Sequence, residues 1–242
     1  MDEIELPGDP TIAIRLRRSA AARRYSLRVS RLDGRVTLTM PRRGSRREAL
    51  SFARDKAAWI RQHLAERPGE VQALPGARIP IAGQMRLLEQ GPVRRLRLEP
   101  DRLVLPAGRA GSPPAIAAFL RELARDRLRA ASDHHAAALG LTFSRLTLRD
   151  TRSRWGSCSS QGALMYSWRL ILAPASVLDY VAAHEVAHLE EMNHAPAFWA
   201  VVARSCPDYA APRQWLRDHG EELHRYRFEA APPTGADIAP IH

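Results

Sequence analysis

The sequence predicts an α+β fold, because strand-type and helix-type patterns follow one another along its 242 residues. Apolar residues make up 45% of the chain and charged residues 26%, which is the balance of an ordinary globular protein. No apolar run approaches the ~20 residues that a membrane-spanning helix needs. The acidic N-terminus, MDEIELPGDP, lacks the basic start and apolar core of a secretory signal. We therefore expect a cytoplasmic protein that does not enter a membrane.

The predicted strands lie in several groups along the chain. Asp33-Gly34 is a typical two-residue turn between two strand patterns, which predicts a β-hairpin in the N-terminal region. The segment RSRWGSCSSQG at 152–162 is rich in serine and glycine and predicts a loop. The residues expected in strands are 12–17, 25–31, 35–40, 78–90, 94–106, 142–149 and 163–172.

The predicted helices begin and end at recognisable signals. Ser45 and Glu48 form a capping-box pattern that opens a helix, and this helix ends before Pro68. Pro114 opens a longer amphipathic helix that ends at Gly140. Further helices are expected at about 177–191, from 196 onward and at about 211–226.

Positive charge is concentrated in the N-terminal half. Residues 1–130 carry 27 Lys+Arg against 14 Asp+Glu, whereas residues 131–242 carry 10 against 12. Guanidinium groups bind phosphates through paired hydrogen bonds, so this half could bind nucleic acid, a nucleotide or an acidic protein. A solvated surface without a partner is the simpler explanation, since no RNA- or DNA-binding motif is present. The two cysteines, Cys158 and Cys206, argue against a disulfide framework.

A short histidine-rich segment, HEVAHLEEMNH at 184–194, predicts a metal site. In a helix, His184 and His188 lie one turn apart on the same face and can bind one ion together. Zinc takes such nitrogen ligands in tetrahedral sites, and a catalytic site keeps one position for water. Glu185 would then act as the general base toward the activated water. In an otherwise apolar helix these polar groups are costly to bury without partners.

The third protein ligand has two candidates. His194 follows His188 by six residues, and a straight helix would carry it ~9 Å further along the axis. The helix must therefore stop and the chain must turn back, with Asn193 the residue most able to take a left-handed backbone. Glu191 is the alternative, because it lies on the same helical face as both histidines if the helix runs straight. The spacing favours His194 and leaves Glu191 open.

Three segments together resemble one known family. RWGSCSSQG at 154–162, SWRLILAP at 167–174 and VAAHEVAHLEEMNHAPAFW at 181–199 resemble the YgjP-like family of zinc metallopeptidases, which are relatives of the WLM and SprT-like metalloproteases. The resemblance extends over roughly residues 10–227 and is much more specific for the family than for a substrate. One departure is Ser167, where relatives often have asparagine before Trp-Arg-Leu.

The resemblance implies both an organisation and a site. Basic N-terminal strands and a helix at 10–130 would pack with a zincin-like catalytic region at 131–228, and one continuous domain over 1–228 is the alternative. Composition alone predicts a disordered tail at 229–242. His184, His188 and His194 would bind zinc (Zn2+), with Glu185 as the general base. The expected substrate is a protein or peptide. The oligomeric state is left open.

Residues near the motif have further expected roles. The strand at 163–172 is expected beside the metal-binding helix as an edge strand, where an extended peptide could pair with it. Cys158 is either a fourth, inhibitory ligand, a redox-sensitive neighbour or an inert buried thiol. The candidates to stabilise a developing oxyanion are Arg152, Arg154, Arg169 and Tyr166, with a salt bridge to Glu190, Glu191 or Asp179 as the alternative for an arginine. Trp155, Trp168, Phe198 and Trp199 are expected in the core, and His134 and His135 on the surface.

Two other functions remain open at this point. A metal-dependent nucleotide pyrophosphohydrolase would use the same activated water, and such an activity has been associated with the family that the chain resembles. A nucleic-acid-binding protein with a structural zinc is the non-enzymatic alternative. The presence of Glu185 argues against the latter, because a structural site has no need of a base and closes its fourth position.

Overall fold

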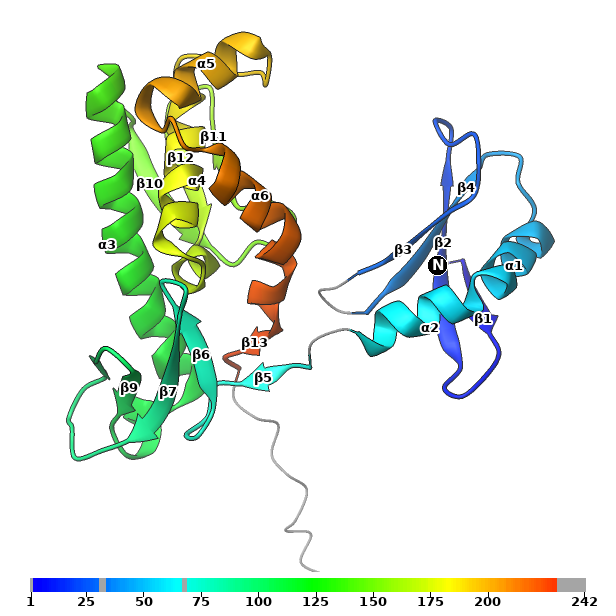
Figure 1. The fold of residues 1–242 in the computed structure, drawn as a ribbon, viewed down its shortest axis with the longest axis horizontal. Coiled ribbons are helices and arrows are strands. Elements are labelled where there is room, and N and C mark those ends of the chain that lie inside the picture. The colour runs from blue at the N-terminus through cyan, green and yellow to red at the C-terminus, as the bar shows by residue number, and fades with distance from the viewer. Residues whose placement is uncertain (1, 31–33, 67–68, 230–242) are drawn as a thin grey trace, which may run out of the picture. The chain divides into compact units, whose positions relative to one another are not determined.

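The computed structural model describes residues 2–30, 34–66 and 69–229, and it is mixed α+β as expected (Figure 1). The chain divides into two compact units, Met1–Gly69 and Glu70–His242. The expected turn at Asp33 and the expected tail from residue 230 lie outside the described residues. None of the described helices is both long enough and apolar enough to span a bilayer.

The N-terminal unit is a four-stranded sheet with two helices on one face. The strand order is β1-β2-β4-β3, from β1 (Glu3–Leu6), β2 (Ile12–Ser19), β3 (Ser26–Val29) and β4 (Val36–Pro41). Side chains alternate along β2 and β4, and the inward ones pack against Ala49, Ala53 and Ile60 of the helices. Strand β1 was not predicted, although the same alternation is present there, with Ile4 and Leu6 buried between exposed glutamates.

The helix predicted from Ser45 is confirmed, but it is broken into two. Helix α1 (Arg46–Asp55) and helix α2 (Ala57–Ala65) meet at Lys56, whose ψ of 11° departs from helical geometry. The capping box is present: Ser45 Oγ accepts from the Glu48 amide at 3.1 Å, and Glu48 Oε2 accepts from the Ser45 amide at 3.0 Å. Tyr25 also donates to Glu48 Oε2 at 2.7 Å, which ties the start of α1 to the segment before β3.

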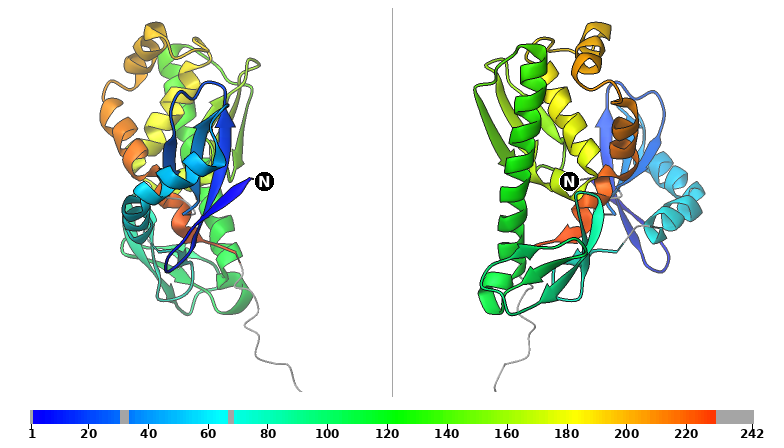
Figure 2. Two further views of the ribbon diagram at one scale, coloured as in Figure 1. Left: turned by 90° about the vertical axis from the view of Figure 1, so that its right-hand side faces the viewer. Right: turned by 60° about the vertical axis from the view of Figure 1, so that its left-hand side comes forward.

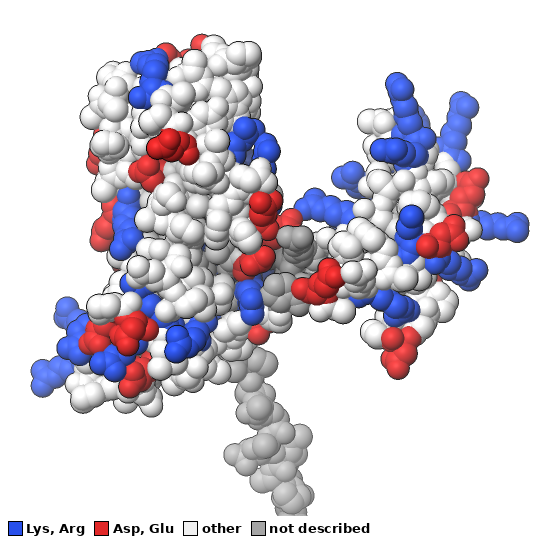
Figure 3. All heavy atoms as spheres, viewed as in Figure 1, with Lys and Arg blue, Asp and Glu red and all other residues white. Residues whose placement is uncertain are grey.

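The positive charge is densest in this first unit. Residues 1–69 carry 16 Lys+Arg against 8 Asp+Glu out of totals of 37 and 26. Figure 3 shows their side chains projecting from the unit into solvent. The solvated-surface interpretation of the charge is therefore consistent with the arrangement of these side chains.

The C-terminal unit contains two larger sheets and one strand pair. One sheet has the order β6-β7-β9-β8, from β6 (Arg78–Ile81), β7 (Gln84–Gln90), β8 (Arg97–Leu98) and β9 (Arg102–Leu105). The second has the order β10-β12-β11, from β10 (Arg145–Arg149), β11 (Gly156–Cys158) and β12 (Ala163–Ser167). Strand β10 is parallel to β12, whereas β11 is antiparallel to it. Strand β5 (Val71–Gln72) pairs with β13 (Tyr226–Arg227).

Four α-helices complete the C-terminal unit. Helix α3 (Pro113–Leu139) runs along the unit, and α4 (Ala175–Ala187) packs against it in the core (Figure 2). Helices α5 (Pro196–Ser205) and α6 (Ala210–His219) follow, and short 3₁₀ segments lie at Gly108–Gly111, Trp168–Leu172 and Gly220–Arg225. As predicted, Gly140 ends α3, with the left-handed φ of 70° that glycine adopts without strain.

The observed division of the chain differs from the one expected from the sequence. The sequence suggested either a boundary at residue 130 or one continuous domain over 1–228, whereas the contacts within the structure divide the chain at Gly69. The physical reason is a shared core: Ile79, Leu88 and Leu103 of the β6–β9 sheet are fully buried in one cluster with Ile116 and Leu120 of α3. Residues 70–130 therefore belong to the same compact unit as the histidine motif.

Three expectations around the RSRWGSCSSQG segment are wrong. The segment is not all loop, because residues 156–158 form β11. The predicted strand at 163–172 stops at Ser167 and continues as a buried 3₁₀ turn, since a short apolar run does not by itself distinguish strand from buried helix. Strand β12 is also the central strand of its sheet, so β11, and not β12, is the edge strand beside α4.

The capping box generates a test of the N-terminal unit. Ser45→Ala removes the side-chain acceptor, which costs about 1 kcal/mol of local stability. We expect amides of residues 46–55 to exchange with deuterium roughly fivefold faster, measured by mass spectrometry on the full chain. Ser51→Ala on the same helix is the control, because Ser51 is exposed and alanine favours a helix. Equal exchange in both variants would contradict the cap.

Candidate metal centre

Helix α4 presents two of the motif's polar residues and ends at the third. His184 and Glu185 lie in its last turn, among buried Ala183, Val186 and Ala187. His188 is the C-cap, and the amides of residues 189 and 190 bond back to the carbonyls of residues 186 and 187. The helix therefore ends at Ala187 and does not continue to Glu191 as the sequence pattern suggested.

The chain then turns back between the helix end and α5. Asn193 Oδ1 accepts a hydrogen bond from the Ala195 amide at 3.0 Å, which fixes the backbone just before α5 begins at Pro196. Among the described residues, the only non-glycine residue with positive φ is Ala82. The expectation of a left-handed Asn193 is therefore wrong, and this residue contributes through its side chain.

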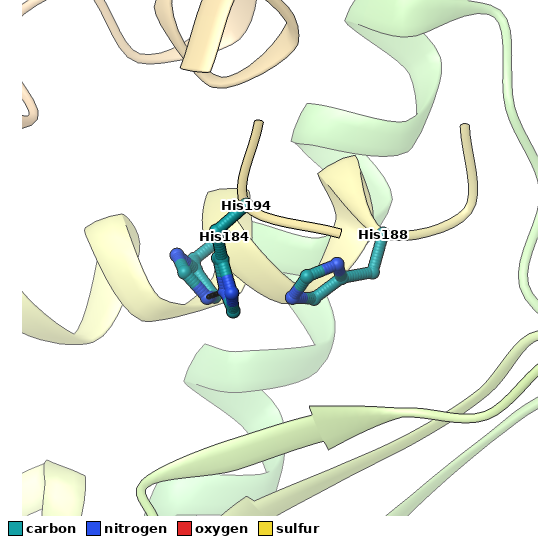
Figure 4. Close-up of side chains that lie close together, drawn as sticks. All are labelled: His184, His188 and His194. Atoms are coloured by element: carbon teal, nitrogen blue, oxygen red, sulfur yellow. Dashed lines mark hydrogen bonds between the residues drawn. The ribbon is translucent and has the colours of Figure 1, made fainter. Parts of the chain in front are cut away.

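The turn brings the three histidines together (Figure 4). Ring nitrogens of His184, His188 and His194 all lie within 4.8 Å of one another, and the two Nε2 atoms of His184 and His194 are 3.1 Å apart. His188 Nδ1 donates to the Glu191 carbonyl at 2.9 Å, which leaves the lone pair of its Nε2 free. Glu191 thus takes part through its backbone, and its carboxylate is outside the group. Three imidazole nitrogens in this arrangement could hold a metal ion.

Phe198 holds the three rings in place. Its ring centroid lies 4.8 Å from that of His184, 4.5 Å from that of His188 and 4.8 Å from that of His194, and its side chain is fully buried. Trp199 lies over His194, and the Arg213 guanidinium lies 4.1 Å from the Trp199 ring centroid. The sequence identified Phe198 only as a core residue; its position four residues after His194 was the available signal.

Burial keeps the histidines in the form that binds metals. It lowers the pKa of His184 to about 3, with the neighbouring rings of His188 and His194 adding to the effect. Burial also lowers the pKa of His188. Both imidazoles are therefore neutral near pH 7, as a ligand must be.

Glu185 is buried close to strand β11. Burial raises the pKa of its carboxyl to about 8, and Arg154 acts in the opposite direction. A Cβ atom at Gly156 would lie 2.5 Å from Glu185 Oε1 and 2.6 Å from its Cγ, closer than real Cβ contacts come. Glycine in the RWGSC segment therefore gives Glu185 its space, a role that sequence reasoning missed.

Strand β11, Glu185 and the histidines line an open pocket of about 220 Å³. Its lining residues are Gly156, Ser157, Cys158, His184, Glu185, His188, Met192 and His194. Burial, with Glu185 as a second cause, raises the pKa of the Cys158 thiol to about 11. The thiol is not part of the described group whose ligand atoms converge, which comprises His184, His188 and His194, and this favours the inert interpretation over the inhibitory ligand.

The four residues expected as candidates to stabilise an oxyanion have different surroundings in the structure. Arg169 is buried and paired with Asp150 through bonds of 2.7 and 3.1 Å, so it pairs with none of the three expected carboxylates. The Tyr166 hydroxyl lies 3.0 Å from Ser132 Oγ inside the core. Arg152 acts electrostatically on His224, whereas Arg154 acts on Glu185. Of the four candidates, Arg154 is therefore the one whose charge acts on a residue of the histidine pocket.

The expectations about burial outside the site were partly right. Trp168 and Phe198 are buried in the core, as predicted, and His134 is exposed. His135 is buried, which contradicts the prediction, and its Nε2 lies 3.2 Å from Asp179 Oδ1. That contact joins α3 to α4, so this histidine has a packing role in positioning the helix of the motif.

Comparisons with known proteins agree with this site. The family model described as "YgjP-like, metallopeptidase domain" matches residues 23–219. The chain belongs to the YgjP-like metallopeptidase family. At the level of the family it is therefore a metal-dependent peptidase that acts on proteins or peptides.

The comparisons with solved structures and with curated proteins give less information about this chain than the family model. The crystal structure of the metallopeptidase zymogen abylysin from Pyrococcus abyssi is 19% identical to the chain, with a TM-score of 0.35. The match covers 39% of this chain and 93% of that one. The search of curated proteins found no match.

The fit between Gly156 and Glu185 generates a test. Gly156→Ala forces the buried carboxylate to move, and we expect the free energy of unfolding to fall by roughly 1–3 kcal/mol. Hydrolysis of an unfolded protein should fall with it, while the metal content stays unchanged. Gly69→Ala is the matched control, because a Cβ atom there meets no other atom within 4 Å. Denaturant titration and metal analysis provide the measurements, and equal behaviour of the two variants would refute the steric argument.

Proposed function

We propose that the protein is a zinc-dependent peptidase in which His184, His188 and His194 bind the metal and Glu185 is the general base. The observation that carries this proposal is the convergence of the three imidazoles and Glu185 on one pocket lined by the edge strand β11. The same residues are the ones that the HEVAHLEEMNH spacing singled out.

The donor set fits zinc. Three imidazole nitrogens suit a tetrahedral ion, and the pocket leaves one side of the group open, as catalytic zinc sites have. Zinc bound there supplies a Lewis acid that makes water acidic and polarises a peptide carbonyl. A purely structural zinc would be closed by a fourth protein ligand, and the described residues offer three in this group.

Glu185 is placed to move the proton. Its carboxylate is next to His184 in sequence, lies against Gly156 and lines the pocket. It accepts a proton from the attacking water and then delivers that proton to the amine of the leaving group. Burial raises the pKa of this carboxyl, which favours its neutral form once the proton has been taken up.

Strand β11 offers the substrate a place to align. Trp155 O accepts from the Ser167 amide, and the Ser159 amide donates to Ala163 O, so alternate residues 155, 157 and 159 face β12. The backbone groups of Gly156 and Cys158 therefore face the open side of the sheet. An extended peptide that pairs with this edge passes along the same pocket as the histidines and Glu185.

The pocket favours peptide over nucleotide hydrolysis. A triphosphate needs cationic groups around its oxygens, and the pocket lining contains neither lysine nor arginine. A peptide instead needs backbone partners, which β11 provides. We therefore place peptide-bond hydrolysis ahead of nucleotide pyrophosphohydrolysis.

The ligand set is tested by elemental analysis of purified protein. We expect about one zinc per chain in the wild type and a large loss in His194→Ala, because two imidazoles hold zinc far more weakly than three. His219→Ala is the control, since His219 lies on α6 outside the group. Full zinc in His194→Ala together with loss in Glu191→Ala would assign the third ligand to Glu191.

The base is tested by Glu185→Gln. The variant keeps the shape of the side chain but cannot accept a proton, so hydrolysis of an unfolded protein should fall by roughly 10²–10⁴-fold. Zinc content should remain at the wild-type level. Glu190→Gln is the control, because Glu190 pairs with Arg204 and does not line the pocket. Unchanged hydrolysis in Glu185→Gln would exclude the proposed role.

A further inference from the structure

Helix α3 has a strip of small and apolar side chains beside the face that it buries. The buried face includes Ile116 and Leu120, which are fully covered by the core. Next to it, Ala118 is exposed, and Ala115 and Phe119 are partly exposed. Residues at i, i+3 and i+4 lie on one side of a helix, so the first turns of α3 present an apolar strip outside the core.

This strip lines a groove of about 630 Å³. Leu96, from the segment before β8, and Leu148 of β10 also line the groove, and both are only partly buried. Ala110, from the 3₁₀ segment before α3, completes the apolar part. Apolar side chains from four separate elements of the C-terminal unit therefore meet at one groove that remains open to solvent.

The charged residues that line the groove are Arg94, Arg95, Arg121, Arg125 and Glu122. Arg125 donates to both carboxylate oxygens of Glu122, at 2.8 and 2.9 Å. Among the ion pairs of the described residues, none involves Arg94, Arg95 or Arg121. Three guanidinium groups of the groove therefore have no carboxylate paired with them in that part of the chain.

The groove is complementary to a polypeptide segment that is both apolar and acidic. Leu96, Phe119 and Leu148 lose exposed area only to a ligand that brings apolar groups of its own. Guanidinium groups bind carboxylates through two parallel hydrogen bonds. A nucleic acid would bring phosphates to the arginines, but it has no aliphatic side chains for the two leucines, and the lining has one aromatic ring for base stacking.

We propose that this groove is a docking site for an acidic amphipathic segment of a partner protein. The apolar side chains of that segment pack against the strip on α3, and its carboxylates bind Arg94, Arg95 and Arg121. The docking site goes beyond the proposed peptidase chemistry, because no residue lines both this groove and the histidine pocket.

The test is a fluorescence anisotropy measurement on full-length, zinc-loaded Glu185→Gln, in which binding is read without turnover. The probe is a labelled peptide in which leucine recurs at i, i+3 and i+4 between glutamates. One comparison peptide has glutamine in place of glutamate, and another has serine in place of leucine. We expect each replacement to weaken binding at least roughly tenfold, because one removes the charged hydrogen bonds and the other the apolar burial.

The first pair of variants separates the groove from net charge. Arg94→Gln with Arg95→Gln should weaken binding of the glutamate peptide at least roughly tenfold, because two of the unpaired guanidinium groups are lost. Arg145→Gln with Arg149→Gln is the matched control. It removes the same charge from exposed positions of β10 that do not line the groove, and it should preserve the binding.

The second pair of variants tests the apolar strip. Ala118→Glu puts a carboxylate among the apolar residues of the groove and should abolish binding of the glutamate peptide. Ala130→Glu makes the same change at an exposed position of the same helix outside the groove and should leave the affinity unchanged. Circular dichroism and zinc content check that each variant is folded.

Three outcomes would overturn the proposal. The first is equal affinity for the glutamate and glutamine peptides, and the second is binding that survives Ala118→Glu. The third is displacement of the labelled peptide by a single-stranded oligonucleotide, or by vesicles of phosphatidylcholine and phosphatidylserine, at lower concentration than by the unlabelled peptide. That result would assign the groove to a nucleic acid or to a lipid surface.

Discussion

The cost of burying charged and polar side chains in an apolar helix governs the C-terminal unit. Helix α4 lies in the core, yet its end carries His184 and Glu185 with little exposure to water. Such groups need partners or a functional reason to be there. The surrounding elements supply contacts and space for them. His135 reaches Asp179 at the other end of α4, Gly156 makes room for the carboxylate, and Phe198 packs against the imidazoles. Much of the local packing is therefore organised around these polar groups.

The early end of α4 is the step that turns a helical stripe into a three-sided site. Had the helix continued, the residue at 194 would lie about one and a half turns beyond His188. Instead, the hydrogen bond from His188 to the Glu191 carbonyl and the Asn193 side-chain bond reverse the chain within a few residues. Phe198 then enters the core from α5 and reaches all three rings. The hydrogen bond to His188 also fixes its tautomer, so the turn orders the ring as well as the backbone.

Sequence reasoning recovered what depends on local pattern and missed what depends on tertiary approach. The capping box at Ser45, the helix from Pro113 to Gly140 and the HEVAHLEEMNH residues each carry a short-range signal, and the structure has each of these elements. The division at Gly69 and the order β10-β12-β11 are decided by contacts between distant segments, which spacing does not encode. The roles of Gly156 and Phe198 likewise depend on contacts between segments that are separated in the sequence.

The division of labour on β11 follows from the period of a strand. Successive side chains of an extended chain point to opposite faces. Position 156 therefore needs a glycine, because a side chain there would collide with Glu185, whereas the side chain of Ser157 points to the opposite face. The free backbone of the same strand lies between these faces. A peptide paired with it would meet the proposed catalytic groups on the face of Gly156, at the histidine pocket.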